Sequence, residues 1–155
     1  MSRSSNAVRL RKLIAEVKPL AREYYLLTGR PLGITAEVAE QEVVRLLKLE
    51  LAPVRQKGYD AIRKTQNGDQ LLQIKGRCVP VGGGSQRVGA INLEREWDAV
   101  LLVLLNEKFD PTAIYEAGRA TLTAAIQRPG SKARNERGQL NVSQFKSAGR
   151  RVWPK

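Results

Sequence analysis

Histidine is absent from this 155-residue sequence. Its absence excludes Ser-His-Asp and Cys-His catalytic triads, His-ligated zinc sites and histidine-metal nucleases. Any catalysis must therefore use carboxylates, lysine or a hard metal ion. Cysteine occurs once, as Cys78, so no internal disulfide can form, and we expect a reducing, cytoplasmic location.

Long apolar segments are missing as well. No apolar run reaches the roughly 18 residues that a membrane span needs, and the first residues lack a signal-peptide core. We therefore expect no membrane partner. The chain is 42% hydrophobic and 27% charged, which is typical of a globular protein.

The net charge of +12 is unevenly distributed. Residues 1–30 contain seven Lys/Arg and two Glu, residues 128–155 contain eight and one, and the span between contains twelve of each sign. A neutral centre with two basic ends predicts a polyanionic partner, first of all a nucleic acid. The alternative is a merely soluble basic protein.

Apolar periodicity predicts helices over residues 7–27 and 35–49, the second capped by Thr35. Residues 59–64 and 70–77 alternate like strands on either side of Asn67-Gly68, so we expect a β-hairpin. Further expected elements are a loop at 79–89, strands at 90–93, 97–106 and 112–117, a helix at 117–127, and a helix over 143–153 capped by Ser143. This order predicts an α/β sandwich around a small mixed sheet.

We expect residues 1–127 to form one domain that includes the N-terminal helix. Residues 128–155 read as a basic linker followed by a short C-terminal helix.

The predicted hairpin carries the residues that are able to do chemistry. Side chains alternate along a strand, so Gln73 and Lys75 share one face while Ile74 points to the other. A charged residue in an apolar strand is seldom buried without a partner, and Asp60 lies on the neighbouring strand. An acid and a lysine at the ends of paired strands can hold a divalent metal and a water against a phosphate. The alternative is a simple cross-strand ion pair.

The pattern Gly-Tyr-Asp60, hairpin, Gln73-Ile-Lys75 resembles the PD-(D/E)XK nuclease superfamily, whose fold is restriction-endonuclease-like. The second motif residue there is usually Glu or Asp, and glutamine replaces it in some members. A preceding helix commonly supplies a glutamate, and "AEQEVVRLL" looks like that element, with Glu40 in the expected place. Glu37 lies one turn earlier on the same face and can share this role.

The resemblance covers residues 35–126. More narrowly, "WDAVLLVLL", "FDPTAIYEA" and "LNVSQFKSAGRRVW" look similar to a small, uncharacterised bacterial family of this fold, here with a QxK variant of the motif. That family implies a fold without implying a substrate.

The superfamily resemblance implies a metal-dependent endonuclease that cuts double-stranded DNA with Mg²⁺ or Mn²⁺. It implies that Asp60 and Glu40 ligate the metal with help from Gln73 and Glu37, while Lys75 orients the water. A homodimer would suit the cutting of both strands. The cations expected to bind phosphates are Lys146, Arg150, Arg151, Arg77 and Arg87. Because Gln73 is neutral, the alternative is a catalytically inactive nucleic-acid-binding or protein-interaction module on the same fold.

Overall fold

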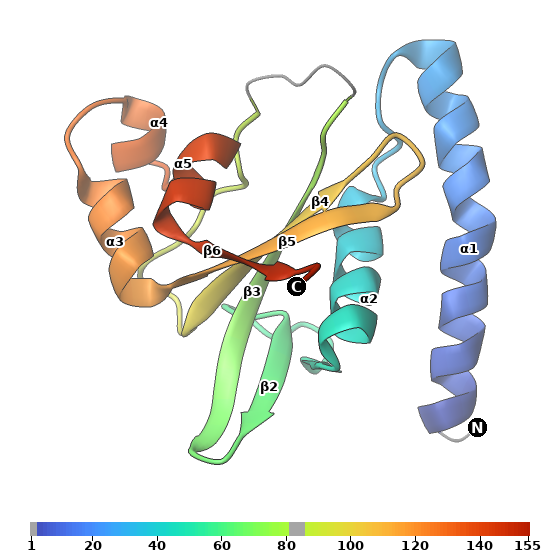
Figure 1. Ribbon diagram of the computed structural model, residues 1–155, viewed down its shortest axis with the longest axis horizontal. Helices are drawn as coiled ribbons and strands as arrows, with labels where there is room; N and C mark the ends of the chain where they lie inside the picture. The colour runs from blue at the N-terminus through green and yellow to red at the C-terminus, as the bar shows by residue number, and fades with distance from the viewer. Residues whose placement is uncertain (1–2, 81–85) are drawn as a thin grey trace.

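A computed structural model describes residues 3–80 and 86–155 of the chain. Within these residues the fold is mixed α/β, with five helices and a six-stranded mixed sheet. Helices cover both faces of the sheet (Figure 1). This architecture confirms the predicted α/β class and the mixed sheet.

The strands lie side by side in chain order, from β1 at one edge to β6 at the other. Neighbours are antiparallel except for β3 and β4, which are parallel. The strands are β1 (Glu50–Leu51), β2 (Ala61–Thr65), β3 (Gly68–Cys78), β4 (Ala99–Leu105), β5 (Pro111–Gly118) and β6 (Arg150–Trp153).

The helices divide between the two faces of the sheet. One face packs on α2, with α1 lying outside α2, while α3, α4 and α5 lie toward the other face (Figure 1). The helices are α1 (Arg3–Thr28), α2 (Thr35–Leu47), α3 (Arg119–Gln127), α4 (Lys132–Asn135) and α5 (Val142–Ala148). Among these helices, none has the length and apolar character needed to cross a bilayer.

Strand β4 is the centre of the core. All seven of its residues are buried, which confirms the prediction that this apolar run is covered on both sides. Leu101 and Val103 pack toward α2, whereas Val100 and Leu102 pack toward α3 and α5. Because successive side chains of a strand point to opposite faces, β4 contributes residues to both hydrophobic clusters, one on each side of the sheet.

The predicted hairpin is confirmed as the antiparallel pair β2–β3. Thr65 pairs with Gly68, so its turn residues are Gln66 and Asn67, one position earlier than the predicted Asn67-Gly68 pair. Of the predicted loop at 79–89, residues 81–85 lie outside the described residues, and the rest forms no regular strand or helix.

Two predicted helix caps are wrong. Thr35 is the first helical residue of α2, and the cap position is Ile34, which makes no side-chain cap. The cap of α5 is Asn141, not Ser143: the Asn141 side chain accepts from the Gln144 N–H and the Gln144 side chain accepts from the Asn141 N–H. A residue of the right type caps a helix only where the backbone before the first turn is extended, as it is at Asn141.

The predicted strand at 90–93 is wrong. Ile91 is buried there, but its N–H binds the carbonyl of Gly138 and does not join a sheet ladder. The predicted final helix ends at Ala148, and the remaining residues form β6 on the edge of β5. Residues 128–155 also place the fully buried Leu140 and Phe145 in the cluster beneath α3, so this segment packs as part of the core.

Candidate active site

Asp60 lies where strands β2 and β3 separate. The last paired residues of the two strands are Ala61 and Leu72, and beyond them β3 continues alongside β4. The Asp60 Oδ2 atom accepts a hydrogen bond from the backbone N–H of Ile74 at 2.8 Å. The carboxylate is therefore held against the free edge of β3, directly beside the residues that were expected to work with it.

Gln73 is buried, and its amide has a fixed orientation. Its Nε2 atom donates to the carbonyl of Gly58 at 2.7 Å, while its Oε1 atom is buried without a hydrogen-bond partner in the described chain. Gly58 has a φ of +98°, and a Cβ there would lie 2.8 Å from the carbonyl oxygen of Glu96. Because both features require glycine, Gly58 is the residue that sets the direction of the Gln73 amide.

Lys75 shares a face of β3 with Gln73, as predicted from alternation. Its side chain is half-buried and has no hydrogen-bond or ion-pair partner among the described residues. Burial lowers the pKa of Lys75; the Asp60 carboxylate opposes this shift and the Arg77 guanidinium adds to it. No direct ion pair joins Asp60 and Lys75 in the described chain, so the simple ion-pair alternative does not account for them.

Glu40 approaches from α2, the helix that packs on β3. Its side chain is half-buried, and it has no hydrogen-bond or ion-pair partner within residues 3–80 and 86–155. Burial raises the pKa of Glu40, and repulsion from Asp60 and then from Glu37 raises it further. The two carboxylates therefore act on each other electrostatically, while Glu37 itself is exposed one turn earlier.

The donor atoms fit a hard divalent cation. Asp60 and Glu40 supply carboxylate oxygens, and Gln73 Oε1 supplies a buried amide oxygen that has no other partner. Oxygen ligands of this kind suit Mg²⁺ or Mn²⁺. Across the described ranges no group of three or more acidic or cysteine side chains gathers around a common point. A metal here would depend on two carboxylates and one amide.

Two of the predicted phosphate-binding cations lie on the same face of the sheet as Lys75. Residue pairing runs from Lys75 to Leu102, then to Tyr115 and Arg151, in a single row across β3, β4, β5 and β6. Three strand spacings of about 4.8 Å place the backbone of Arg151 roughly 14 Å from that of Lys75. Lys146 lies over the Tyr115 ring, 5.3 Å from its centroid.

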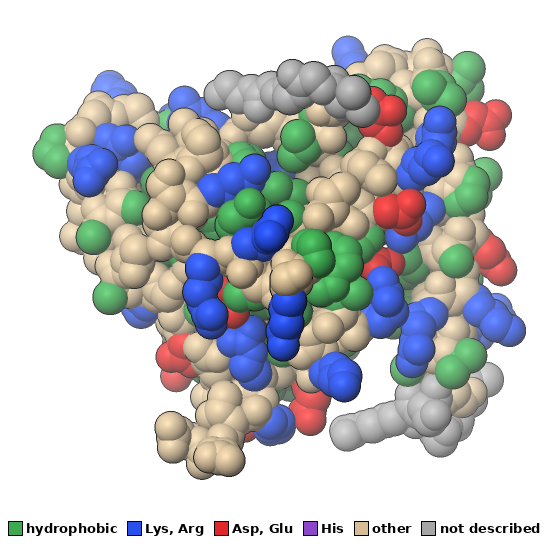
Figure 2. All heavy atoms as spheres, viewed as in Figure 1, with side chains coloured by type: hydrophobic (Ala, Val, Ile, Leu, Met, Phe, Trp, Pro, Cys, Tyr) green, Lys and Arg blue, Asp and Glu red, His purple; other side chains and the backbone are tan. Residues whose placement is uncertain are grey.

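Figure 2 shows Lys and Arg side chains gathered over the part of the surface where α5 and β6 lie in Figure 1. Arg150 is exposed on β6 next to Arg151 but belongs to the opposite face. Arg87 is exposed, whereas Arg77 donates hydrogen bonds to the carbonyls of Arg87 and Gly76. The guanidinium of Arg77 therefore already ties the segment after the 81–85 stretch to β3.

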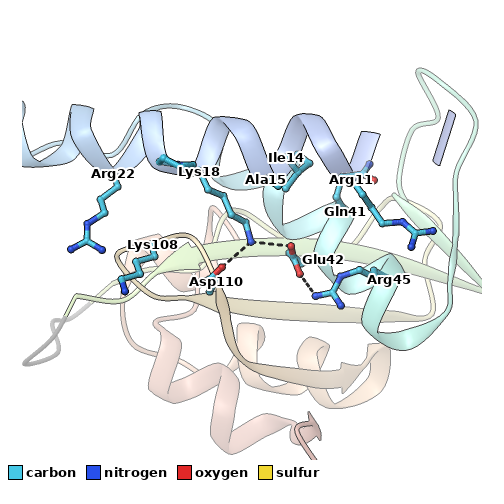
Figure 3. A pocket seen from close by; sticks show the side chains of 11 residues that line it. Arg11, Ile14, Ala15, Lys18, Arg22, Gln41, Glu42, Arg45, Lys108 and Asp110 are labelled. Atoms are coloured by element: carbon cyan, nitrogen blue, oxygen red, sulfur yellow. Dashed lines mark hydrogen bonds and ion pairs between the residues drawn. The ribbon is translucent and has the colours of Figure 1, made fainter. Parts of the chain in front are cut away.

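A hollow of about 640 Å³ lies elsewhere, between α1 and α2 (Figure 3). Lys18 of α1 bridges it, donating to Glu42 and to Asp110 at 3.0 Å each. Glu40 and Glu42 are two positions apart on α2 and so point in different directions. This groove is therefore separate from the cluster at Asp60, and its ion pairs hold α1 to the body of the protein.

No family model matches the chain, and no curated protein matches it. The structure places Asp60 where it acts electrostatically on both Glu40 and Lys75, and sequence reasoning gave Gly58 no role. The only sequence feature that pointed to Gly58 was its place two residues before Asp60.

Proposed function

We propose that this protein is a metal-dependent endonuclease that hydrolyses phosphodiester bonds in DNA, built on a restriction-endonuclease-like sandwich. The observation that carries the proposal is the set of unpartnered polar groups around Asp60: the Glu40 carboxylate, the Gln73 Oε1 atom and the Lys75 amine. Buried polar groups without partners are unfavourable for folding, and perturbed pKa values of this kind cluster at functional sites.

Each residue has a distinct part in this proposal. Asp60, Glu40 and Gln73 Oε1 would hold a Mg²⁺ or Mn²⁺ ion, which would supply Lewis-acid chemistry and water activation. Gly58 keeps the Gln73 oxygen turned away from the backbone carbonyl that binds the amide nitrogen. The lowered pKa of Lys75 increases the fraction of neutral amine, which is able to accept a proton from the attacking water.

The basic surface supports DNA as the substrate. Lys146 and Arg151 lie on the side of the sheet that carries Lys75, separated from the site by the buried Leu102, so they would contact phosphates at some distance from the bond that is cut. Contacts of this kind position a duplex without reading its sequence. Cutting both strands would require two copies of the site, and the expected setting is the cytoplasm.

The test is the nicking of supercoiled plasmid with Mn²⁺ or Mg²⁺. Lys75→Ala should lose about 100-fold or more in rate with little change in DNA affinity, because its role is in the transition state. Lys64→Ala is the matched control, since Lys64 is an exposed lysine on β2 that pairs only with Asp69 in the described chain. Equal cleavage by Lys75→Ala and wild type would contradict the proposed site.

A second candidate is a nucleic-acid-binding or protein-interaction module that performs no hydrolysis. The neutral Gln73 and the limit of two carboxylates at the described site favour it. If a broad panel of DNA and RNA substrates remains uncut, while DNA binding is the same with Mn²⁺ and with EDTA, this candidate replaces the nuclease.

A further inference from the structure

The exposed apolar side chains of the described chain are concentrated on α1. The large hydrophobic residues with high exposure on this helix are Val8, Leu13, Leu20, Tyr24, Leu26 and Leu27, with Leu51 and Val54 elsewhere. Leu20 is 61% exposed and Leu27 is 80% exposed. Monomeric proteins rarely expose a contiguous row of leucines to water, so this surface indicates a binding interface.

Six apolar residues of α1 follow a heptad spacing. They recur at intervals of three and four, and we call them the α1 seam: Leu10, Leu13, Val17, Leu20, Tyr24 and Leu27. In heptad notation Leu13, Leu20 and Leu27 occupy the three d positions, and Leu10, Val17 and Tyr24 occupy the three a positions, of which Val17 is β-branched. Leucine at d with a β-branched residue at a is a pattern that favours two parallel strands.

The body of the protein holds α1 by a different side. Ala21 is fully buried, Ile14 packs on the same cluster, and Lys18 makes the ion pairs to Glu42 and Asp110. These contacts turn the seam away from α2 and fix which side of the helix faces outward. Pro19 lines the groove between α1 and α2, so the seam itself contains no proline.

We infer that the α1 seam is the dimerisation surface of this protein, which pairs with the seam of a second copy in a parallel, two-fold symmetric arrangement. A two-fold interface uses the same patch on both copies, and a seam of uncharged residues is self-complementary. This inference does not rest on the nuclease proposal.

The acidic residues beside the seam favour one orientation of the pair. Glu16 and Glu23 occupy g positions next to it. In a parallel pair Glu16 and Glu23 lie opposite positions 21 and 28 of the other copy, which carry no charge, so no like charges meet. An antiparallel pair with all six layers aligned would bring Glu16 against the other copy's Glu23.

The experiment is light scattering by the full chain, free of nucleic acid, from about 5 to about 500 µM, a range that brackets a micromolar Kd. Wild type should rise toward twice the monomer mass. The double variant Leu13→Glu/Leu20→Glu should remain monomeric, with association weakened about 100-fold or more, because it buries unpaired charge. Leu26→Glu is the matched control: Leu26 is 72% exposed on the same helix but lies off the seam.

A wild type that stays monomeric throughout the range would overturn the inference. So would Leu26→Glu weakening the dimer as much as the seam variant does, or seam-dependent binding to anionic vesicles by a monomer. Orientation is tested with Leu13→Cys in a Cys78→Ala background. Oxidation should cross-link this variant into a covalent dimer, since identical d residues meet only in the parallel arrangement. Failure to cross-link in a chain that still dimerises would overturn the parallel arrangement.

Discussion

A Cβ atom added at Gly76 would lie 2.6 Å from the Cβ of Ala39 and 3.0 Å from the carbonyl oxygen of Thr35. Helix α2 therefore approaches β3 at a distance that glycine alone permits. Gly76 follows Lys75 on the strand, and Ala39 precedes Glu40 on the helix. The closeness of these two small residues holds Glu40, the neighbour of Ala39, near the edge of β3, where the Asp60 carboxylate repels it.

Gly76→Ala should therefore destabilise the fold and move Glu40 away from Asp60. The expected loss is about 1–3 kcal/mol, the usual result of overpacking, measured by urea denaturation. Gly33→Ala is the control, since a Cβ at Gly33 meets no atom within 4 Å. Equal midpoints for the two variants would show that α2 moves aside without resistance.

Glu40→Gln should stabilise the metal-free protein at neutral pH. The folded-state pKa of Glu40 lies above its ordinary value, so the native state holds its proton more tightly than the unfolded chain does. Stability from this group is present at low pH and falls as pH rises through the window between 4.5 and the raised value. The gain from the substitution should appear above that window in EDTA and vanish below it, whereas Glu23→Gln on exposed α1 should change little.

Lys75→Met should also stabilise the metal-free protein while removing activity. Burial lowers the pKa of Lys75, so the native state binds its proton less tightly than the unfolded chain, and the penalty diminishes as pH rises toward 10.5. Thermal melts from neutral to alkaline pH should show the advantage of Lys75→Met shrinking in that direction. A Lys75→Met chain that is less stable than wild type at neutral pH would mean that the ammonium has a structural partner.

Lys18→Met should loosen α1. The Lys18 side chain is 14% exposed and the Glu42 side chain 9%, so their pair is largely removed from water, and Arg45 still contacts Glu42 after the change. We expect a loss of about 1–3 kcal/mol, or roughly 2–4 °C in Tm for each kcal/mol at this chain length. Lys64→Met, which breaks an exposed pair with Asp69, should stay within about 0.5 kcal/mol of wild type.

Arg150→Gln/Arg151→Gln should weaken DNA binding and its salt dependence. Each lost phosphate contact reduces the log–log salt slope by about 0.9, and only Arg151 lies on the Lys75 face, so the double variant should flatten the slope by about 1. Substitution is preferable to deleting residues 128–155, which would remove β6 and the buried Phe145. The control is Lys48→Gln/Lys64→Gln, with the same charge change in the neutral central span. Identical slopes for wild type and the arginine variant would place the phosphate contacts elsewhere.

The elements that sequence could predict are those whose pattern is local. Alternation and the Asn-Gly turn located the β2–β3 hairpin, and a continuous apolar run located β4. The four residues of β6 are too few to show a period, and their strand conformation comes from pairing with β5. Thr35 and Ser143 are suitable cap residues in sequence, but the chain path before each helix places other residues at the cap.

In the candidate site too, local patterns could be predicted from the sequence and long-range contacts could not. Alternation placed Gln73 and Lys75 on one face of β3, because that depends only on spacing along a strand, whereas the role given to Asp60 came from the motif and stays a prediction. The sequence did not predict the hydrogen bond from the Ile74 N–H to Asp60. It also did not predict that the Gly58 carbonyl accepts a hydrogen bond from the Gln73 amide. These depend on how the chain between β1 and β2 folds back onto β3, a long-range contact with no periodic signature.

The chain-order arrangement of the sheet bears on how the protein is made. Each strand from β2 onward pairs with the strand synthesised just before it, so a nascent chain is able to extend the sheet one strand at a time. The parallel step from β3 to β4 is the exception, because a parallel neighbour requires a long crossover, here residues 79–98. Until that crossover closes, the hairpin lacks β4 and its apolar face is uncovered. That interval is when the nascent chain is most exposed to misassociation with other chains.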